Sequence, residues 1–418
     1  MMSAATMLSQ TQLLTFATSA ATTTTGGVSE GALSTRGTTS AAVYKVLTRA
    51  TSRISTVIPL RRQRTLDARI SVLYSSRRTQ GVWRNSAGLS ISISGGVGPS
   101  SRRAQSLASE GPSAMAEEEK VPVVSADWLH QHLNDPNLKV LDASWYMPFD
   151  KRNPLQEYKE SHIPGALFFD IDAIGDITSE MPHMLPSEDA FSAAASALGL
   201  RNDDNIVVYD GKGIFSAARV WWMFRAFGHD KVWVLDGGLP QWLQQKYPVE
   251  SASSTALGKV GASTEAIKKI YGGEQVDSGV FKAHLQQNLV LSLDEVMQNI
   301  TEKKYLLVDA RSKARFDGSA PEPRQGVRGG HVPGSTCVPF TEVLTGTGAL
   351  LPAEELVEKF QSSGVSLDSP IAVSCGTGVT ACILALALHR LGKADIPVYD
   401  GSWTEWGLTP HVPVETNV

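Results

Sequence analysis

Cysteine is scarce in this chain, and its few cysteines exclude a disulfide-stapled domain. The 418 residues include three cysteines, Cys337, Cys375 and Cys382, an odd number with no C-x-x-C pair. Such usage favours a reducing compartment over secretion. The nine histidines show no zinc-ligand spacing, so we expect no structural metal. No stretch approaches the ~20 uninterrupted apolar residues that a membrane-spanning helix needs, so we expect no membrane partner.

Acidic residues are almost missing from the first 115 positions. Twelve Arg and one Lys stand there against three acids, a balance of +10, whereas the remainder has 25 basic and 39 acidic residues, a balance of −14. Arg-rich, Ser-rich and acid-poor composition is typical of an organelle transit peptide. We therefore expect residues 1–118 to be an import signal for the mitochondrion, with the plastid as the alternative and Met115 as the start of a possible cytosolic form. The other interpretation is a basic arm for nucleic acid, but no nucleic-acid-binding motif follows it, so we expect no such partner.

The rest of the chain repeats itself. Six short segments of residues 119–250 recur in the same order in residues 287–416, with an offset that drifts only from 164 to 169. The matched segments are 125–129 with 292–296, 140–143 with 307–310, 162–165 with 331–334, 185–186 with 351–352, 206–211 with 371–376, and 236–242 with 400–406. Chance does not produce six ordered matches. We expect two homologous domains, 119–250 and 287–416, joined by a linker over 251–286.

Within each repeat, short apolar runs alternate with helical patterns. Residues 305–308 and 371–373 have the length and composition of strands, and 379–391 reads as an apolar helix that ends at Gly392. Ser125 and Ser292 are suited to cap helices. This rhythm predicts an α/β fold in which each domain has a mostly parallel sheet with helices on both faces. We expect the tryptophans to lie in the core, among them Trp221, Trp222, Trp242 and Trp406.

The chemistry is expected at Cys375, which stands between a buried strand and a helix in the run Ser-Cys-Gly-Thr-Gly-Val-Thr-Ala. Ligands of open α/β sheets bind at the carboxyl ends of strands. A helix N-terminus has unpaired N–H groups and favours an anion, and the glycines at 376 and 378 let successive amides face one point. An anionic sulfur is stabilised in such a place, which makes the cysteine a nucleophile. A buried structural cysteine is the alternative, and it fits Cys337 and Cys382 better.

The chain resembles the tandem-domain thiosulfate and mercaptopyruvate sulfurtransferases over residues 120–416. The resemblance rests on the Cys-Gly-Thr-Gly-Val-Thr-Ala motif at 375–381 and on Gly-Ser-Ala-Pro-Glu-Pro-Arg at 318–324. It implies two rhodanese-like domains, of which the first is catalytically silent. Asp210 agrees with this, because it stands where Cys375 stands in the second repeat and cannot carry sulfane sulfur.

The resemblance implies a ping-pong reaction that needs no cofactor. Cys375 takes sulfur from a small-molecule donor, and the resulting persulfide then passes it to cyanide or to a thiol such as thioredoxin or glutathione. The loop would hold the persulfide anion mainly through the backbone amides of four residues. These residues are Gly376, Gly378, Val379 and Thr380.

Two donors compete. Thiosulfate users of this family resemble one another in carrying basic side chains inside the loop, whereas Gly376 and Thr377 are uncharged, as in the 3-mercaptopyruvate users, although these more often have Ser than Thr. In that subgroup two arginines grip the substrate, and they map onto Arg315 and Arg324. The planar fork of arginine suits a carboxylate. The resemblance therefore favours 3-mercaptopyruvate, with thiosulfate as the alternative.

The same subgroup is described with a hydroxyl–His–Asp proton relay. Its candidates here are Thr377, His183 and Asp172, and since the last two belong to the first domain, the site would lie in the cleft between the domains. Histidine is suited to carry a proton near neutral pH. The alternative is a histidine that merely packs in its loop.

Two other classes of protein fit the residues less well. Cysteine phosphatases share a cysteine loop at a helix N-terminus, but they need an arginine six residues after the cysteine, where this chain has Ala381. A non-enzymatic persulfide carrier could keep Cys375, but it would not need Arg315 and Arg324.

Overall fold

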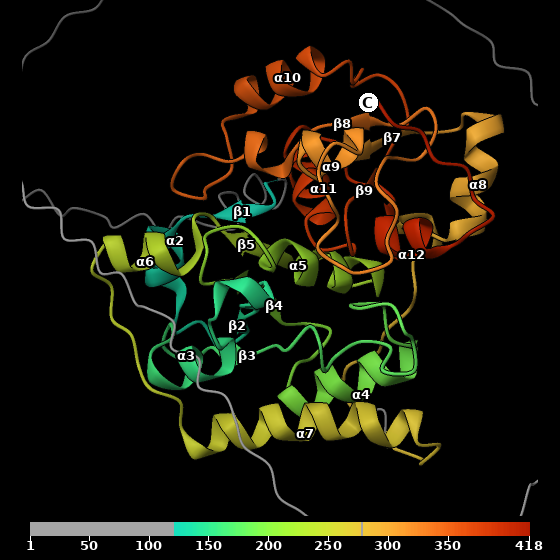
Figure 1. Cartoon of the computed structure of the whole chain (residues 1–418). Coiled ribbons are helices and arrows are strands. Elements are labelled where there is room, and N and C mark those ends of the chain that lie inside the picture. The colour runs from blue at the N-terminus through green and yellow to red at the C-terminus, as the bar shows by residue number, and fades with distance from the viewer. Residues whose placement is uncertain (1–120, 277–278) are drawn as a thin grey trace, which may run out of the picture. The chain divides into compact units, whose positions relative to one another are not determined.

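Two parallel sheets of identical strand order form the framework of a computed structural model, which describes residues 121–276 and 279–418 (Figure 1). The expected transit peptide, residues 1–118, lies outside the described residues. In order across the first sheet the strands are β1 (Val123–Val124), β5 (Val232–Leu235), β4 (Asn205–Tyr209), β2 (Leu138–Asp142) and β3 (Leu167–Phe168). In the second they are β6 (Val290–Leu291), β10 (Val398–Tyr399), β9 (Ile371–Ser374), β7 (Leu306–Asp309) and β8 (Thr336–Cys337). The α/β class and the duplication are confirmed.

Helices cover both faces of each sheet. Those of the first half are α2 (Ala126–His132), α3 (Pro154–Glu160), α4 (Glu188–Leu198), α5 (Ala217–Ala226), α6 (Gly238–Gln244) and α7 (Ser254–Tyr271), with a 3-10 turn η1 (Pro148–Asp150). Those of the second half are α8 (Leu293–Glu302), α9 (Lys313–Asp317), α10 (Ala353–Ser362), α11 (Ala381–Arg390) and α12 (Ser402–Leu408), with η2 (Gln287–Leu289) and η3 (Phe340–Val343). No helix in these described parts of the chain is both long and apolar enough to cross a membrane.

Local sequence signals set the helix boundaries. The Ser125 hydroxyl accepts the amide of Trp128, and Ser292 forms a reciprocal capping box with Glu295, so both predicted caps are confirmed. At the other end of α11, Gly392 has a φ of +84°, which a glycine adopts without strain. This helix begins at Ala381 rather than at 379 as expected, because the two residues before it form a turn that continues the cysteine loop.

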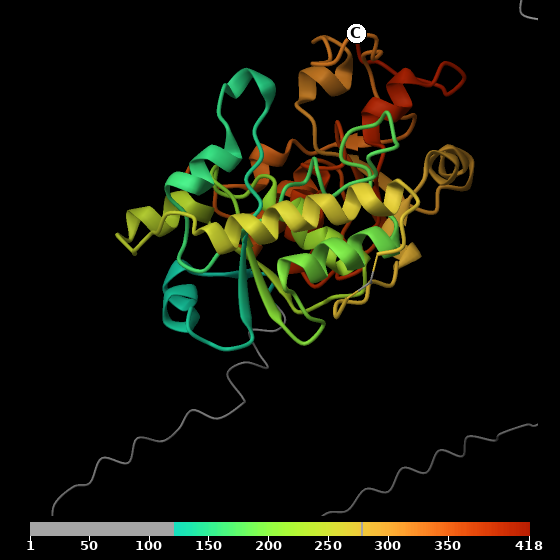
Figure 2. The same cartoon turned by 90° about the horizontal axis from the view of Figure 1, so that it is seen from below.

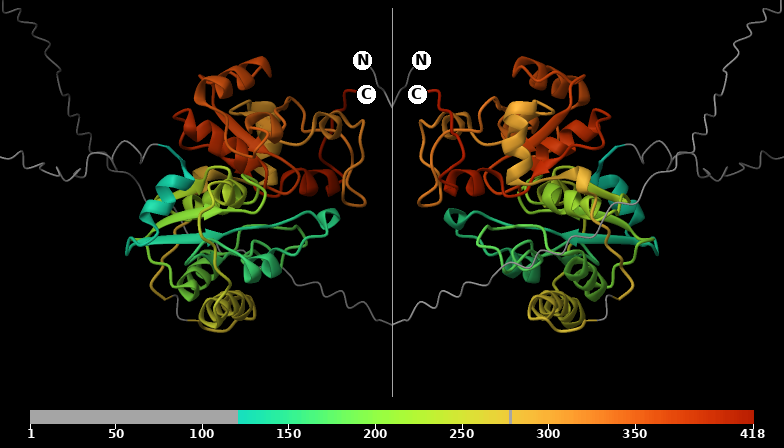
Figure 3. Two further views of the ribbon diagram at one scale, coloured as in Figure 1. Left: turned by 90° about the vertical axis from the view of Figure 1, so that its left-hand side faces the viewer. Right: turned by 90° about the vertical axis from the view of Figure 1, so that its right-hand side faces the viewer.

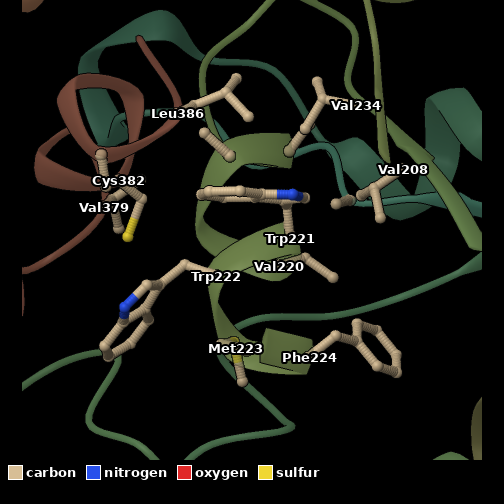
Figure 4. Packing of buried hydrophobic residues seen from close by; sticks show 14 of the residues in the cluster. Val208, Val220, Trp221, Trp222, Met223, Phe224, Val234, Val379, Cys382 and Leu386 are labelled. Carbon is tan, nitrogen blue, oxygen red and sulfur yellow. The ribbon is translucent and has the colours of Figure 1, made fainter. Parts of the chain in front are cut away.

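The two halves share one hydrophobic core, in which α5 packs against α11. Figure 4 shows Trp221 and Trp222 of α5 facing Cys382 and Leu386 of α11, and all four side chains are at least 98% buried. Trp242 and Trp406 are also buried, so the prediction that the tryptophans lie in the core is confirmed. The helix that follows the cysteine loop is therefore anchored on the first half of the chain.

The segment 251–286, expected to be a linker, is largely ordered against the first half. Its helix α7 runs alongside α4, as Figures 1 and 2 show, and the two are seen nearly end-on in Figure 3. Val260 and Ile267 of α7 enter the core because they recur on one helical face. Beyond the helix, the amides of His284 and Gln286 bond to carbonyls at the end of α5. Structurally, this segment thus completes the first half.

Candidate active site

Cys375 follows β9 directly, and the carbonyls of its loop point outward. The Cys375 carbonyl accepts the amide of Trp403 at 2.9 Å, and the Gly376 carbonyl accepts the amide and hydroxyl of Thr404 at 2.9 and 2.7 Å. In a planar trans peptide the N–H points away from the C=O. The amides of Gly376 and Thr377 are therefore turned away from α12, towards the inside of the loop.

A serine hydroxyl links the two ends of the cysteine loop. Ser402 Oγ accepts the amides of Cys375 and Gly378, each at 3.1 Å, and donates to the carbonyl of Tyr399 at 2.8 Å. Ser402 holds this position with a φ of +51°, an uncommon conformation for a residue with a side chain. The strained residue thus fixes both ends of the turn that begins at the cysteine.

The hydrogen bond from the Gly378 amide to Ser402 changes the role predicted for Gly378. The amide of Gly378 is taken by Ser402, so Gly378 contributes through its backbone conformation, with a φ of +74°. A Cβ atom on it would lie 2.7 Å from the carbonyl oxygen of Asp400 and 2.8 Å from Arg219. By contrast, the amides of the other loop residues have no hydrogen-bond partner among the described residues. They belong to Gly376, Thr377, Val379 and Thr380.

The first half contains an anion in the equivalent loop. The carboxylate of Asp210 accepts the amides of Lys212, Phe215 and Ala217 at 2.9, 2.8 and 2.9 Å. Burial raises the pKa of Asp210 to about 6, although these three amides oppose the shift. The repeat matches Lys212 and Phe215 with Thr377 and Thr380, whose amides have no partner among the described residues. The loop of the first half therefore displays how this backbone binds a negative charge at the position of Cys375.

A cavity of about 350 Å³ opens onto Cys375 and is lined by both halves of the chain. Its volume is within the range of sites for small molecules. The first half contributes Trp145, Met147, Phe149, Lys212 and Phe215, and the second half contributes Arg311, Ser312, Arg315, Pro323, Arg324, Phe340 and the cysteine loop. The first half thus contributes mainly apolar side chains beside Lys212, and the second half contributes three arginines beside the cysteine loop.

The predicted arginines lie in this cavity. Arg315 is paired with the buried carboxylate of Glu322 at 2.5 Å, and its Nη2 would lie 3.2 Å from a Cβ at Gly376, so its guanidinium covers the cysteine loop. Glu322 also binds Arg311 at 2.7 Å. Arg324 has no ion pair among the described residues. Burial and the neighbouring Arg315 lower the pKa of Arg324, although the nearby Cys375, Asp172 and Glu322 oppose this shift. An incoming carboxylate would meet a guanidinium that is not yet held in an ion pair with any described residue.

The structure brings two of the three relay candidates together. His183 Nδ1 lies 3.1 Å from Asp172 Oδ1, although outside hydrogen-bond geometry, and Trp145 donates its indole N–H to Asp172 Oδ2 at 2.9 Å. Loss of solvent raises the pKa of Asp172, but His183, Trp145 and Arg324 outweigh this and hold that pKa below its ordinary value. Trp145 packs edge-on against His183 and lines the cavity. Thr377 has no hydrogen bond to either partner among the described residues.

Sequence reasoning missed four residues that shape the site. Glu322 lay within the quoted Pro-Glu-Pro-Arg segment and Ser402 within the repeated Asp-Gly-Ser segment, so both could have been found. Trp145 and Arg219 carried no comparable signal. Within the described ranges, no group of His, Cys, Asp and Glu side chains is arranged to hold a metal ion.

Known proteins resemble this chain in both sequence and fold. The Rhodanese-like domain family matches it twice, at residues 125–245 and 292–409. The chain is 61% identical over 296 residues to thiosulfate/3-mercaptopyruvate sulfurtransferase 1, mitochondrial, of Arabidopsis thaliana. This match covers 71% of the chain and 78% of that protein. The chain is also 43% identical over 290 residues to the 3-mercaptopyruvate sulfurtransferase of Rattus norvegicus, covering 68% of this chain and 91% of that protein.

A solved structure is similar to this chain as well. The crystal structure of SseA from Escherichia coli, described with the rhodanese fold and mechanism of 3-mercaptopyruvate sulfotransferases, has a TM-score of 0.57 and 38% identity, covering 68% of this chain and 99% of that one. Two parallel sheets of one topology and a cysteine loop on the second thus define a tandem rhodanese-like protein. The chain belongs to the two-domain rhodanese-like sulfurtransferases, as its motifs implied.

Proposed function

We propose that this sulfurtransferase takes sulfane sulfur from 3-mercaptopyruvate onto Cys375 and passes it to a thiol or to cyanide, releasing pyruvate. The observation that carries the proposal is the pairing of an uncharged cysteine loop with Arg324, a cavity arginine without an ion pair among the described residues. Relatives named 3-mercaptopyruvate sulfurtransferase support the same donor.

In the first half-reaction, the Cys375 thiolate attacks the sulfur of 3-mercaptopyruvate. A sulfur–sulfur bond forms, the carbon–sulfur bond breaks, and its electron pair leaves on carbon as the enolate of pyruvate. The thiol proton of the substrate ends on that carbon, so the products are the Cys375 persulfide anion and pyruvate. The free loop amides, among them those of Thr377 and Val379, would stabilise the persulfide charge, as the amides of the first half do for the Asp210 carboxylate.

The arginines would hold the donor in place. Arg324 offers an unpaired guanidinium to the substrate carboxylate, and Arg315, fixed by Glu322 above Gly376, is placed for the keto oxygen. Two-point recognition by guanidinium groups orients a planar keto acid with its sulfur towards the cysteine. Because both cations are held on one wall, the apolar wall formed by Trp145 and Phe215 would cover the methylene group.

His183 and Asp172 are proposed to move the substrate proton, with the Thr377 hydroxyl as the contact to the substrate. Their side chains are already 3.1 Å apart, and both ring nitrogens of His183 lack a hydrogen bond among the described residues. An unbonded imidazole beside a carboxylate is suited to accept and return a proton.

Thiosulfate is proposed as a slower donor. Lys212, Arg311, Arg315 and Arg324 line the cavity, and a dianion is attracted to cations. Two similar proteins from Arabidopsis thaliana are named for thiosulfate as well as for 3-mercaptopyruvate. Most of these cations are already paired, however, with Asp150, Glu322 and Asp309 as their partners. A dianion needs two neutralising charges, whereas Arg324 alone can neutralise the single carboxylate of the keto acid, so we expect the dianion to gain less.

The donor is tested by measuring kcat/KM of the purified protein on 3-mercaptopyruvate and on thiosulfate, with cyanide as a common acceptor. The expected result is a clear preference for 3-mercaptopyruvate. A higher kcat/KM on thiosulfate would leave a sulfurtransferase but overturn the assigned donor.

We also propose mitochondrial import through residues 1–118 and acceptors that include thioredoxin or glutathione. The composition of the first 115 residues supports import, and one relative is named as mitochondrial. For the domain boundaries, the contacts of α7 and of residues 281–286 support a first domain that extends from about residue 119 to 286, followed by a catalytic domain over 287–416.

A further inference from the structure

Arg219 reaches out of the silent half into the catalytic loop. It lies on α5, its side chain is fully buried, and its guanidinium Nη2 pairs with Asp400 of the second half at 2.7 Å. Nη1 donates to the carbonyl of Gly378 at 3.3 Å, and Nη2 also donates to the carbonyl of His183 at 2.5 Å. One cation therefore contacts the loop of the nucleophile, the segment of the candidate proton carrier and an acid that follows β10.

The bond to Gly378 sets the direction of an amide. Because the carbonyl of Gly378 faces Arg219, the N–H of the same peptide, which belongs to Val379, points the opposite way. That amide is one of the loop donors without a partner among the described residues. The Cys382 thiol donates to the same carbonyl at 3.1 Å, so Arg219 and Cys382 together hold the peptide that turns this donor away from them.

The same pair fixes the segment that carries His183. Arg219 binds the carbonyl of His183, and the second carboxylate oxygen of Asp400 accepts the amide of Leu185 at 2.9 Å. His183 has a φ of +63°, a conformation that the surrounding contacts must maintain. The ion pair therefore sets the position of His183 relative to the cysteine loop.

The duplication provides an internal comparison. Asp236 is the counterpart of Asp400 in the first repeat, and it accepts the amide of Leu350 at 2.8 Å as Asp400 accepts that of Leu185. Within residues 121–276 and 279–418, Asp236 forms no ion pair. Asp400, which lies beside the loop of the nucleophile, therefore has an arginine partner among the described residues, and its counterpart Asp236 has none.

We infer that Arg219 is a positioning residue of the catalytic domain, which aligns the Val379 amide and the His183 segment with Cys375 through its pair with Asp400. The His183 part of this inference rests on the proposed function. The first domain then has a defined task in catalysis, which is to add support from outside to a loop that Ser402 and Cys382 hold from within the catalytic domain.

The test replaces Arg219 with lysine in the full chain. Lysine keeps the charge next to Asp400, but its point charge cannot serve three acceptors in fixed directions. The matched control is Arg225→Lys, at the far end of the same helix. Arg225 crosses the same interface, with bonds to His389 and to the carbonyl of Ala394, but contacts nothing in the cysteine loop.

We expect Arg219→Lys to lower kcat on 3-mercaptopyruvate by roughly 10²-fold, the effect of a small misplacement of catalytic groups, while the donor KM changes much less because Arg315 and Arg324 are untouched. The lifetime of the Cys375 persulfide in the absence of acceptor should shorten as well. Arg225→Lys should retain the kcat and the persulfide lifetime of the wild type, even if both variants lose thermal stability.

Wild-type kcat and persulfide lifetime in folded Arg219→Lys would overturn the inference, and so would an equal loss in both variants. If Arg219→Lys does not fold, Asp400→Asn takes its place, since it keeps the shape and the bond to Leu185 but removes the negative charge; unchanged kcat there overturns the inference. Failure of the wild type to form any persulfide is a separate outcome, which contradicts the proposed function instead.

Discussion

Removing either of the two arginines proposed to bind the substrate should lower activity, but only one removal should lower stability. Arg315 is bonded to Glu322, whose buried carboxylate would lose a partner in Arg315→Ala. Arg324 has no ion pair among the described residues and is repelled by Arg315, so its removal leaves no buried group unpaired. The two variants therefore separate substrate binding from structural support.

The magnitudes follow from the contacts. A charged hydrogen bond to substrate contributes about 1.5–3 kcal/mol, so each alanine variant should lower kcat/KM on 3-mercaptopyruvate by roughly 10–100-fold. Arg315→Ala should also lose about 1–2 kcal/mol of unfolding free energy, because Glu322 retains only Arg311 as a partner. In a domain of this size that lowers Tm by roughly 2–8 °C. Arg324→Ala should have a Tm equal to or above that of the wild type.

The assay combines pyruvate release with thermal unfolding of the same preparations, and lysine variants serve as controls. Arg315→Lys and Arg324→Lys should each retain more activity than the matching alanine variant but less than the wild type, because an ammonium group cannot make the two-point contact. Full activity of Arg324→Ala on 3-mercaptopyruvate would refute the assigned contact. A fall in its Tm as large as that of Arg315→Ala would refute the claim that Arg324 is unpaired.

Three further predictions concern the rest of the site and the leader. His183→Gln should lower kcat by about 10²–10⁴-fold with little change in KM, and an equally active variant would make His183 structural. The pKa of Asp210 is raised to about 6 in the folded chain, so between about pH 4 and 6 the folded state binds a proton that the unfolded state has lost. The stability of the wild type relative to Asp210→Asn should therefore fall by about 3 kcal/mol as the pH rises from about 4 to 6. A stability difference that does not change with pH would contradict this. A chain that starts at Met115 should keep full activity, while residues 1–115 fused to a fluorescent protein should enter mitochondria, with plastids as the alternative; a truncated chain that does not fold would move the domain boundary.

The sequence predicted the architecture well because the fold is duplicated. Matching segments at corresponding positions required two sheets of one topology, and the caps at Ser125 and Ser292 follow from local hydrogen bonding alone. Helix α7 was missed because Gly258 and Gly261 lower its helix propensity, and its apolar face becomes evident only against α4.

Most of the predicted site residues line one cavity, with His183, Asp172 and Gly378 outside its lining, but most of the contacts that hold them were not predictable. Arg219 acts through backbone carbonyls of distant segments, and such bonds leave no pattern in the sequence. Ser402 lies in the repeated Asp-Gly-Ser segment, but its bonds to the loop amides become evident only in the structure. The difference between Gly378, whose amide is bonded, and its neighbours with free amides depends on the same geometry. A polar residue within an apolar helix, as Arg219 is within α5, indicates a buried partner without identifying it.

The transferred sulfur is expected on Cys375, and the intact mass of the protein tests this most directly. After incubation with 3-mercaptopyruvate and no acceptor, the mass of the wild type should rise by one sulfur atom, and a thiol should reverse the change. Cys382→Ser and Cys337→Ser should gain the same adduct, since both side chains are buried away from the cavity. Cys375→Ser should gain none and should not turn over; a sulfur adduct that persists in this variant would contradict the account.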